Sequence, residues 1–188
     1  MTTEQKEQPE QTKNKDSMVP KKYSILFFVT LISVVLDQVT KIYVHNSFRL
    51  GESVSVIPGF FSFTYVRNTG AAFGILAQAD ANWRRPFFLI VPVIALVVIG
   101  MMLRQLPKNA ILVSTALSLV VGGAIGNLID RSRLGYVIDF IDFHYGYHTH
   151  FPAFNIADSA ICIGVGLMFL DMFLQSRSEP GSEKSVKI

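Results

Sequence analysis

The sequence predicts an all-α membrane protein: a four-transmembrane-helix bundle with a small extracytoplasmic β-sheet. Half of the 188 residues are hydrophobic and only 16% are charged, whereas about a quarter of the residues of soluble globular chains are charged. Four apolar stretches follow one another along the chain, and each has the roughly 20 residues that a helix needs to cross a bilayer. Only helices and closed barrels satisfy every backbone polar group in lipid, so we expect four membrane-spanning helices.

These stretches form one domain between two polar tails. We expect residues 1–22 and 175–188 to be disordered cytoplasmic tails, because they are rich in Lys, Glu, Gln, Ser and Thr and show no apolar periodicity. The first stretch is too long for a cleavable signal peptide, and no small-residue cleavage site follows it. The domain therefore spans residues 23–174, with apolar stretches at Tyr23–Val44, Pro86–Leu103, Ala110–Ile129 and Phe154–Leu174.

Lys and Arg are distributed unevenly between the two sides of the predicted bundle. Four spans place both termini and the short connection 105–109 on one side, and the long segments 46–85 and 130–153 on the other. The terminal side carries ten Lys and Arg residues and the opposite side seven, so the positive-inside rule places the termini in the cytoplasm. No basic run resembles a nucleic-acid-binding stripe, so we expect a membrane-lipid environment and no nucleic acid partner.

The first long segment has the pattern of a β-hairpin. Ser53–Pro58 and Phe60–Val66 are short runs of aromatic and β-branched residues, separated by a Pro-Gly turn signal. We expect these runs to form a small sheet on the outer surface of the bundle. The second long segment contains residues 137–143, which we expect to be a loop.

Acidic residues gather at one predicted membrane depth. Asp37, Asp130 and Asp158 lie at the same end of their helices, and Asp139 can reach that depth from the loop 137–143. An ionisable residue inside a membrane is costly and usually marks a functional site. Two carboxylates at close quarters cannot both ionise easily, so one can take a proton from water while the other polarises a carbonyl. This is the chemistry of an aspartyl protease.

Spacing alone leaves two other interpretations open. Lys41 follows Asp37 by four residues, the spacing at which opposite charges meet on a helix face. Asp130 could likewise pair with Arg131 or Arg133, so these acids could be structural. A ring of carboxylates could also pass protons or cations across the membrane.

Two further site types are disfavoured by their residue sets. His144, His148 and His150 lie close together, but no cysteine or sufficient set of acids completes a zinc shell, so we expect no metal and no other cofactor. Ser159 follows Asp158 directly, but Lys41 is the only lysine near that depth, and nothing in the sequence brings the two together as a Ser/Lys dyad.

Five motifs occur in an order that resembles the lipoprotein signal peptidase (signal peptidase II) family. The resemblance covers residues 23–174, nearly the whole chain outside the tails. Together the five motifs are far more specific than any one of them. They are Asp37–Lys41 (DQVTK), Arg67–Phe73 (RNTGAAF), Gly126–Arg131 (GNLIDR), Val137–Phe140 (VIDF) and Phe154–Ser159 (FNIADS).

The resemblance implies a specific activity. Such enzymes are metal-independent aspartyl endopeptidases that remove signal peptides from diacylglyceryl-modified prolipoproteins, cutting before the lipidated cysteine. It implies a multi-pass protein of the bacterial inner membrane, with its active site near the outer membrane surface. It also implies inhibition by globomycin-type peptides, and we expect a monomer.

The resemblance assigns the catalytic pair to Asp139 and Asp158. Asp130 is the rival of Asp139, but its neighbour Arg131 would hold it ionised, which suits an ion pair better than a dyad with a shared proton. We expect Asn127 to bond to Asp130 and Asn155 to Asp158, since each pair lies one turn apart. The expected substrate-binding or supporting residues are Asn68, Asn127, Arg131, Asn155, Asp37, Lys41 and Asp130.

Overall fold

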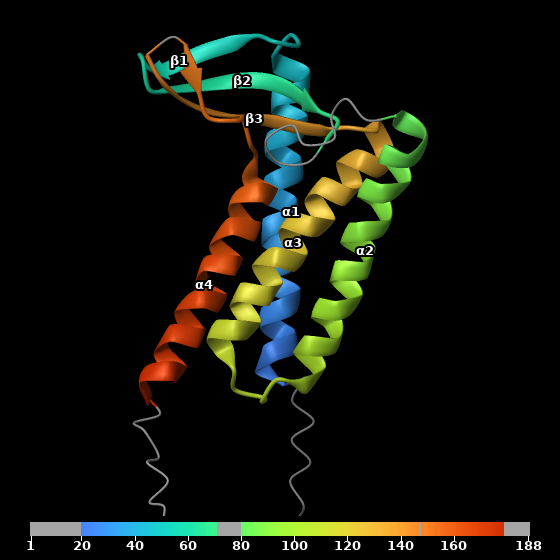
Figure 1. Cartoon of the computed structure of the whole chain (residues 1–188), viewed down its shortest axis with the longest axis vertical. Coiled ribbons are helices and arrows are strands. Elements are labelled where there is room, and N and C mark those ends of the chain that lie inside the picture. Colours follow the sequence, from blue (N-terminus) through green and yellow to red (C-terminus); the bar gives the residue numbers. More distant parts are fainter. Residues whose placement is uncertain (1–19, 71–79, 147, 179–188) are drawn as a thin grey trace, which may run out of the picture.

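The computed structural model describes residues 20–70, 80–146 and 148–178, and it confirms the predicted fold class. Four long helices carry a four-stranded antiparallel sheet at one end (Figure 1). The helices are α1 (Lys21–Ser47), α2 (Ala81–Gln105), α3 (Ile111–Leu134) and α4 (Ile156–Ser178). The strands are β1 (Ser53–Ile57), β2 (Phe61–Asn68), β3 (Val137–Tyr145) and β4 (Thr149–His150).

All four helices are long and apolar enough to cross a membrane. Both described ends of the chain, together with the α2–α3 connection, lie at the end of the bundle away from the sheet (Figure 1). Residues 1–19 and 179–188 of the expected tails lie outside the described residues, whereas Lys21, Lys22 and residues 175–178 are helical. The helices therefore extend beyond the apolar stretches into polar sequence.

Helix α2 starts earlier than its apolar stretch because its first turn is capped. The Asp80 side chain accepts a hydrogen bond from the Asn82 backbone N–H at 2.8 Å, which satisfies one of the free donors at a helix start. Pro86, where the apolar stretch begins, therefore lies inside the helix.

Three glycines allow α1 and α4 to pack closely against α3. A Cβ atom added at Gly122 would lie 2.6 Å from Ser33 Cβ, and one at Gly126 would lie 2.5 Å from Asp37 Oδ2. A Cβ at Gly123 would overlap the Ala157 carbonyl oxygen. Because these contacts leave no room for a methyl group, the small residues bring the polar ends of α1 and α4 onto the α3 backbone.

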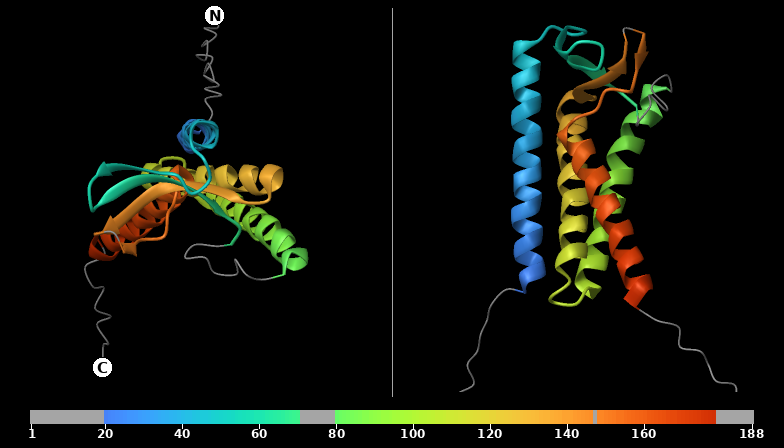
Figure 2. Two further views of the ribbon diagram at one scale, coloured as in Figure 1. Left: turned by 90° about the horizontal axis from the view of Figure 1, so that it is seen from above. Right: turned by 90° about the vertical axis from the view of Figure 1, so that its left-hand side faces the viewer.

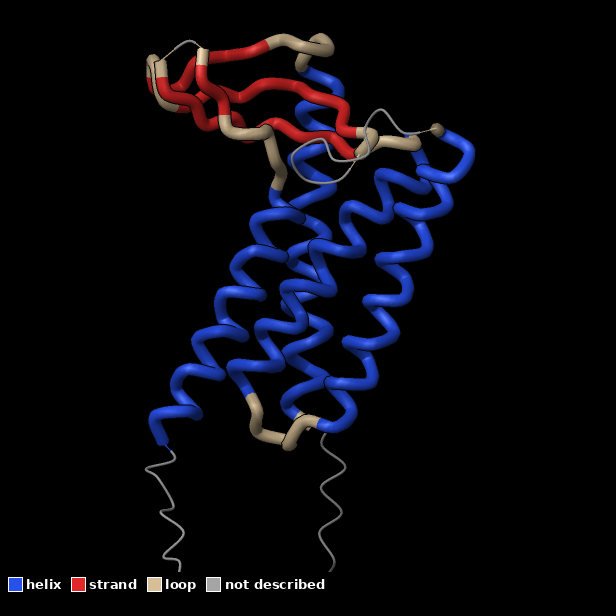
Figure 3. The backbone as a smooth tube through the Cα atoms, in the orientation of Figure 1, coloured by secondary structure: helices blue, strands red, loops and turns tan. Residues whose placement is uncertain are grey.

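The sheet lies across the ends of the helices (Figures 2 and 3). Its order is β1-β2-β3-β4, and the predicted hairpin is present as β1 and β2. Residues 137–143, expected as a loop, instead belong to β3, which pairs with β2. The pairing of Val66 with Asp139 places this aspartate on a strand above the bundle.

Gly126→Ala is expected to lower the melting temperature of the purified protein. The new methyl group would collide with the buried Asp37 carboxylate, and overpacking of this kind costs about 1–3 kcal/mol. Gly100→Ala is the matched control, because a Cβ there meets nothing within 4 Å, and Ala is favoured over Gly in a helix by about 1 kcal/mol. Thermal unfolding in one detergent compares them; equal melting temperatures would contradict the close packing at Gly126.

Candidate active site

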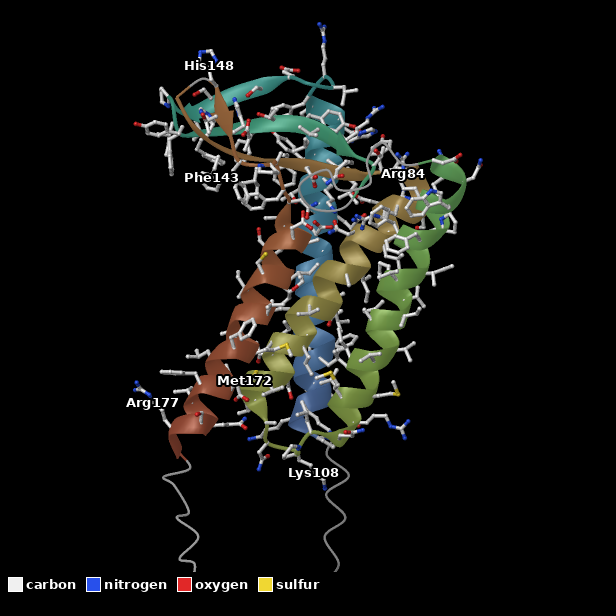
Figure 4. The ribbon with its side chains drawn as sticks, in the orientation of Figure 1. Arg84, Lys108, Phe143, His148, Met172 and Arg177 are labelled. Carbon is white, nitrogen blue, oxygen red and sulfur yellow. The ribbon has the colours of Figure 1, made fainter. Side chains whose placement is uncertain are left out.

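Polar side chains gather where the helices meet the sheet (Figure 4). The structure brings together all four acids that the sequence singles out, but it divides them into two groups. Asp139 and Asp158 share a set of asparagine partners, and Asp37 and Asp130 share a lysine.

Asp139 is held by two amides. Asn155 Nδ2 donates to its Oδ1 at 2.6 Å, and Asn68 Nδ2 donates to its Oδ2 at 3.0 Å. The side chain is almost completely buried. Burial, and then the negative charge of Asp158, raise the pKa of Asp139 to about 7, against the opposing effect of the two hydrogen bonds. Asp139 is therefore an acid that exchanges its proton near neutral pH.

Asp158 lies in the first turn of α4, where it takes part in capping that helix. Asn155 Oδ1 accepts a hydrogen bond from the Asp158 N–H at 2.9 Å, and Asp158 Oδ2 accepts one from the Asn155 N–H at 3.3 Å. This reciprocal arrangement is that of a capping box. Asn127 Nδ2 donates to Asp158 Oδ1 at 2.7 Å, so both carboxylate oxygens are fixed.

These contacts confirm the expected pair of Asn155 with Asp158 and correct the expected partner of Asn127. Among the hydrogen bonds of the described residues, Asn127 does not bond to Asp130 on its own helix; it reaches across to Asp158 on α4. Asn155 Nδ2 also reaches Asp139 on β3, a partner that the sequence did not indicate. Neighbouring side chains on one helix face both point toward the packed partner helix, so close packing favours partners on another element.

Lys41 is buried between Asp37 and Asp130. Its Nζ lies 2.9 Å from Asp37 Oδ2 and 3.1 Å from Asp130 Oδ2, and it donates to Asn127 Oδ1 at 2.9 Å. The predicted Asp37–Lys41 pair is thus present. Asp130 pairs with Lys41 and with neither Arg131 nor Arg133 among the ion pairs of the described residues.

Asp37 and Asp130, the two acids paired with Lys41, also accept hydrogen bonds from the backbone next to Asp158 and Asp139. Asp37 Oδ1 accepts a hydrogen bond from the Ala157 N–H at 2.9 Å, and Asp130 Oδ2 accepts one from the Ile138 N–H at 3.0 Å. Ala157 and Ile138 directly precede Asp158 and Asp139. The lysine cluster therefore fixes the backbone on which both remaining acids are carried.

Asp139 and Asp158 are also linked through a short backbone bridge. The Phe140 and Ile141 N–H groups donate to the Phe154 carbonyl at 3.0 and 2.8 Å, and the Phe154 N–H donates to the Ile141 carbonyl at 3.1 Å. This bridge lies one residue after Asp139 and directly before the Asn155 cap, so it joins β3 to the start of α4.

A cavity of about 540 Å³ opens beside Asp158. One part of its wall is polar and includes Arg131. This guanidinium donates to the Gly70 carbonyl at 3.2 Å and interacts electrostatically with Asp158 and Asp139. Residues 71–73 of the RNTGAAF motif lie outside the described residues. The polar wall contains Asn68, Asn127, Arg131, Asp158 and Ser159, and the apolar wall Val137, Phe151, Pro152, Ala153, Phe154, Ile161 and Cys162.

Of the apolar wall, the sequence singled out Val137 and Phe154, as parts of motifs, and not the other residues. Cys162 follows Asp158 by four residues, and this spacing is the one signal that could have placed it beside the acid. Phe151 to Phe154 come from the connection before α4, whose path only the tertiary structure reveals. The cavity suits a ligand with an apolar body and a polar group near Asp158.

The histidines of the disfavoured zinc site and the serine of the disfavoured Ser/Lys dyad make other contacts. His144 Nε2 lies 3.0 Å from Ser62 Oγ, and His150 Nδ1 lies 2.9 Å from Asp142 Oδ1. Within the described residues no group of three or more His, Cys, Asp or Glu side chains is placed to hold a metal ion. Ser159 Oγ donates to the Asn155 carbonyl of its own helix at 2.9 Å.

Comparison with known proteins decides the family. The family model described as signal peptidase (SPase) II matches residues 29–174. The chain belongs to the signal peptidase II family. This family membership makes it a protease, and the four apolar helices make it a multi-pass membrane protein.

Relatives of this signal peptidase II chain cover most of its length. A lipoprotein signal peptidase of Geobacter metallireducens is 50% identical over 157 residues, which are 84% of this chain and 95% of that protein. One from Pseudomonas putida is 45% identical over 152 residues, 81% and 88% of the two chains. A solved structure described as a bacterial membrane enzyme is 37% identical, with a TM-score of 0.74 over 87% of this chain and 95% of that one.

Lys41→Met is expected to destabilise this signal peptidase II chain strongly. The change leaves two buried carboxylates without their cation, and breaking a buried ion pair in this way costs about 3–5 kcal/mol. Lys21→Met, at the exposed start of the same helix, is the control and should be nearly neutral. Thermal unfolding in detergent measures both. Unchanged stability of Lys41→Met would show that the cluster does not depend on its charge.

Proposed function

We propose that the chain removes signal peptides from diacylglyceryl-modified prolipoproteins, cleaving before the lipidated cysteine, with Asp139 and Asp158 as an aspartyl catalytic pair. One observation carries the assignment. These two acids come from different elements, share Asn155 as a partner and interact electrostatically, and Asp158 lines a cavity whose walls are largely apolar.

The environments of the two acids suit different roles. Burial and the charge of Asp158 favour the protonated form of Asp139. Asp158 lines the cavity, and its two oxygens accept hydrogen bonds from Asn127 and the Asn155 N–H, so it is the acid that faces the space for water and substrate. Asp158 is therefore the general base, and Asp139 is the general acid.

The reaction then follows from these two roles. The Asp158 carboxylate takes a proton from water while the water oxygen attacks the scissile carbonyl carbon. Asp139 donates its proton to the carbonyl oxygen, which gives a neutral tetrahedral diol. In the second step Asp139 takes back a proton from the diol, Asp158 gives its proton to the leaving nitrogen, and the carbon–nitrogen bond breaks. The signal peptide leaves with a new carboxyl group, and the cysteine acquires a free amine.

Asp130 is a poorer candidate for the second acid. Its two oxygens are already occupied by Gln38 Nε2 at 3.0 Å, the Ile138 N–H and Lys41. Its role is to support the β3 backbone before Asp139, and Asp37 has the matching role before Asp158.

The cavity supports a lipidated substrate. Phe151, Phe154 and Ile161 offer an apolar wall for the signal peptide or the acyl chains, and Asn68 and Arg131 offer polar groups for the peptide backbone. A globomycin-type inhibitor would occupy the same cavity. We propose that the chain is a monomer in the bacterial inner membrane. The distribution of Lys and Arg supports cytoplasmic termini, with the sheet end at the outer surface.

Asp139→Asn and Asp158→Asn are each expected to abolish cleavage without loss of folding. Asn is nearly isosteric with Asp but cannot exchange the catalytic proton. The double variant should be little worse than either single variant, because residues that act as a unit are strongly non-additive. The measurement is cleavage of a diacylglyceryl-modified prolipoprotein by purified protein in EDTA, with globomycin binding as the test of folding.

Asp130→Asn is the matched control for this experiment. It should lower the melting temperature or reduce activity in part, because it weakens the Lys41 cluster without removing a reacting group. Full activity in Asp139→Asn, together with none in Asp130→Asn, would move the pair to Asp130 and Asp158.

The pH dependence of kcat/KM is expected to show an alkaline limb with an apparent pKa near 7. Asp139 must be protonated to act, and its protonated fraction falls about tenfold for each pH unit above its pKa, which is raised to about 7. Asn68→Ala should shift this limb to higher pH, because the hydrogen bond from Asn68 lowers the pKa of Asp139 and its loss therefore raises that pKa. A shift to lower pH would contradict the assignment of Asp139 as the acid.

A further inference from the structure

A second cavity, of about 270 Å³, lies between the sheet ends of α1 and α3. Lys41 and Asp130 line its inner part. Lys41 donates to Asn127, which lines the active-site cavity, so one hydrogen bond separates the two spaces. The second cavity shares no lining residue with the first, and the proposed reaction does not use it.

The cavity lies at the depth where hydrocarbon gives way to lipid headgroups. On α1 the exposed side chains change from apolar Ile42 and Tyr43 to polar His45 and Asn46. On α3 the exposed Leu134 lies beside Arg133 at the helix end. Tyrosine and basic side chains are enriched at this level of a membrane.

The charges that line the cavity favour an anion. Asp130 is the one carboxylate among its lining residues, and its oxygens are bound by Gln38, the Ile138 N–H and Lys41, which it shares with Asp37. The Arg133 guanidinium has no ion-pair partner in the part of the chain that the structure describes. The Arg133 guanidinium at the opening can therefore donate hydrogen bonds to an anion.

His45 and Asn46 add two such donors beside Arg133. His45 Nδ1 lies 2.6 Å from the Tyr65 hydroxyl, which leaves Nε2 for another partner. The Asn46 side chain is exposed at the same opening. Guanidinium, imidazole and amide groups are the usual ligands of phosphate oxygens.

We propose that this cavity binds the phosphate of an anionic phospholipid from the surrounding leaflet. Arg133, His45 and Asn46 would bind the headgroup, and the acyl chains would lie along Ile42 and Leu134. The exposed apolar residues directly beside the basic opening favour a lipid over a free phosphate ion. The inference concerns a site apart from the catalytic pair and does not rest on the proposed reaction.

Thermal unfolding of the purified chain in a neutral detergent tests the proposal. Dioctanoyl phosphatidylglycerol should raise the melting temperature by about 5 °C or more at 100 times its Kd. Dioctanoyl phosphatidylcholine and inorganic phosphate should have little effect. An equal shift with phosphatidylcholine would overturn the role of headgroup charge, and an equal shift with inorganic phosphate would overturn the lipid assignment.

Variants locate the site. Arg133→Gln should lose most of the phosphatidylglycerol shift, and so should Asn46→Asp, which adds a negative charge at the same opening with little change in size. Arg49→Gln makes the same charge change on an exposed residue at the same end of the bundle, outside the cavity, and should keep the full shift. An unchanged shift in both Arg133→Gln and Asn46→Asp would overturn the proposal.

Discussion

The buried ion cluster around Lys41 is the interaction on which the active-site end depends. One ammonium group forms ion pairs with both Asp37 and Asp130, which come from two different helices. Burying two carboxylates and one cation would cost free energy if the remaining carboxylate lone pairs had no hydrogen-bond donors. Gln38 and the backbone N–H groups of Ile138 and Ala157 supply those donors. The cluster is therefore satisfied by β3 and α4 as well as by its own helices, and it ties all four elements together.

Close packing is the condition for this cluster. Because Gly126 has no side chain, the Asp37 carboxylate can lie against the α3 backbone. The same closeness lets Asn127 on α3 reach both Lys41 and Asp158. The ion cluster therefore depends on the small residues of α3, because a larger side chain there would displace the charged groups.

The sequence predicted the helices more completely than the contacts among their polar residues. Length and hydropathy are local properties, so the four spans, the β1–β2 hairpin and the Asp37–Lys41 pair could be inferred from neighbours in the chain. The contacts of Asn127 with Asp158 and of Asn155 with Asp139 depend on which element packs opposite. The pairing of β3 with β2 likewise joins residues that are far apart in sequence, and the walls around Cys162 form only when the connection before α4 folds back.

The bridge at Phe154 constrains the spacing of Asp139 and Asp158 within one short segment. Its three backbone hydrogen bonds join β3 to the start of α4, and they act together with the Lys41 cluster, which binds the backbone N–H before each acid. Helix α2 packs chiefly on α3 and contributes nothing to this bridge. The contact of α2 with the site is made instead through Phe88, whose ring lies under the Arg131 guanidinium. The separation of the two acids and the placement of the cation beside them therefore depend on different helices.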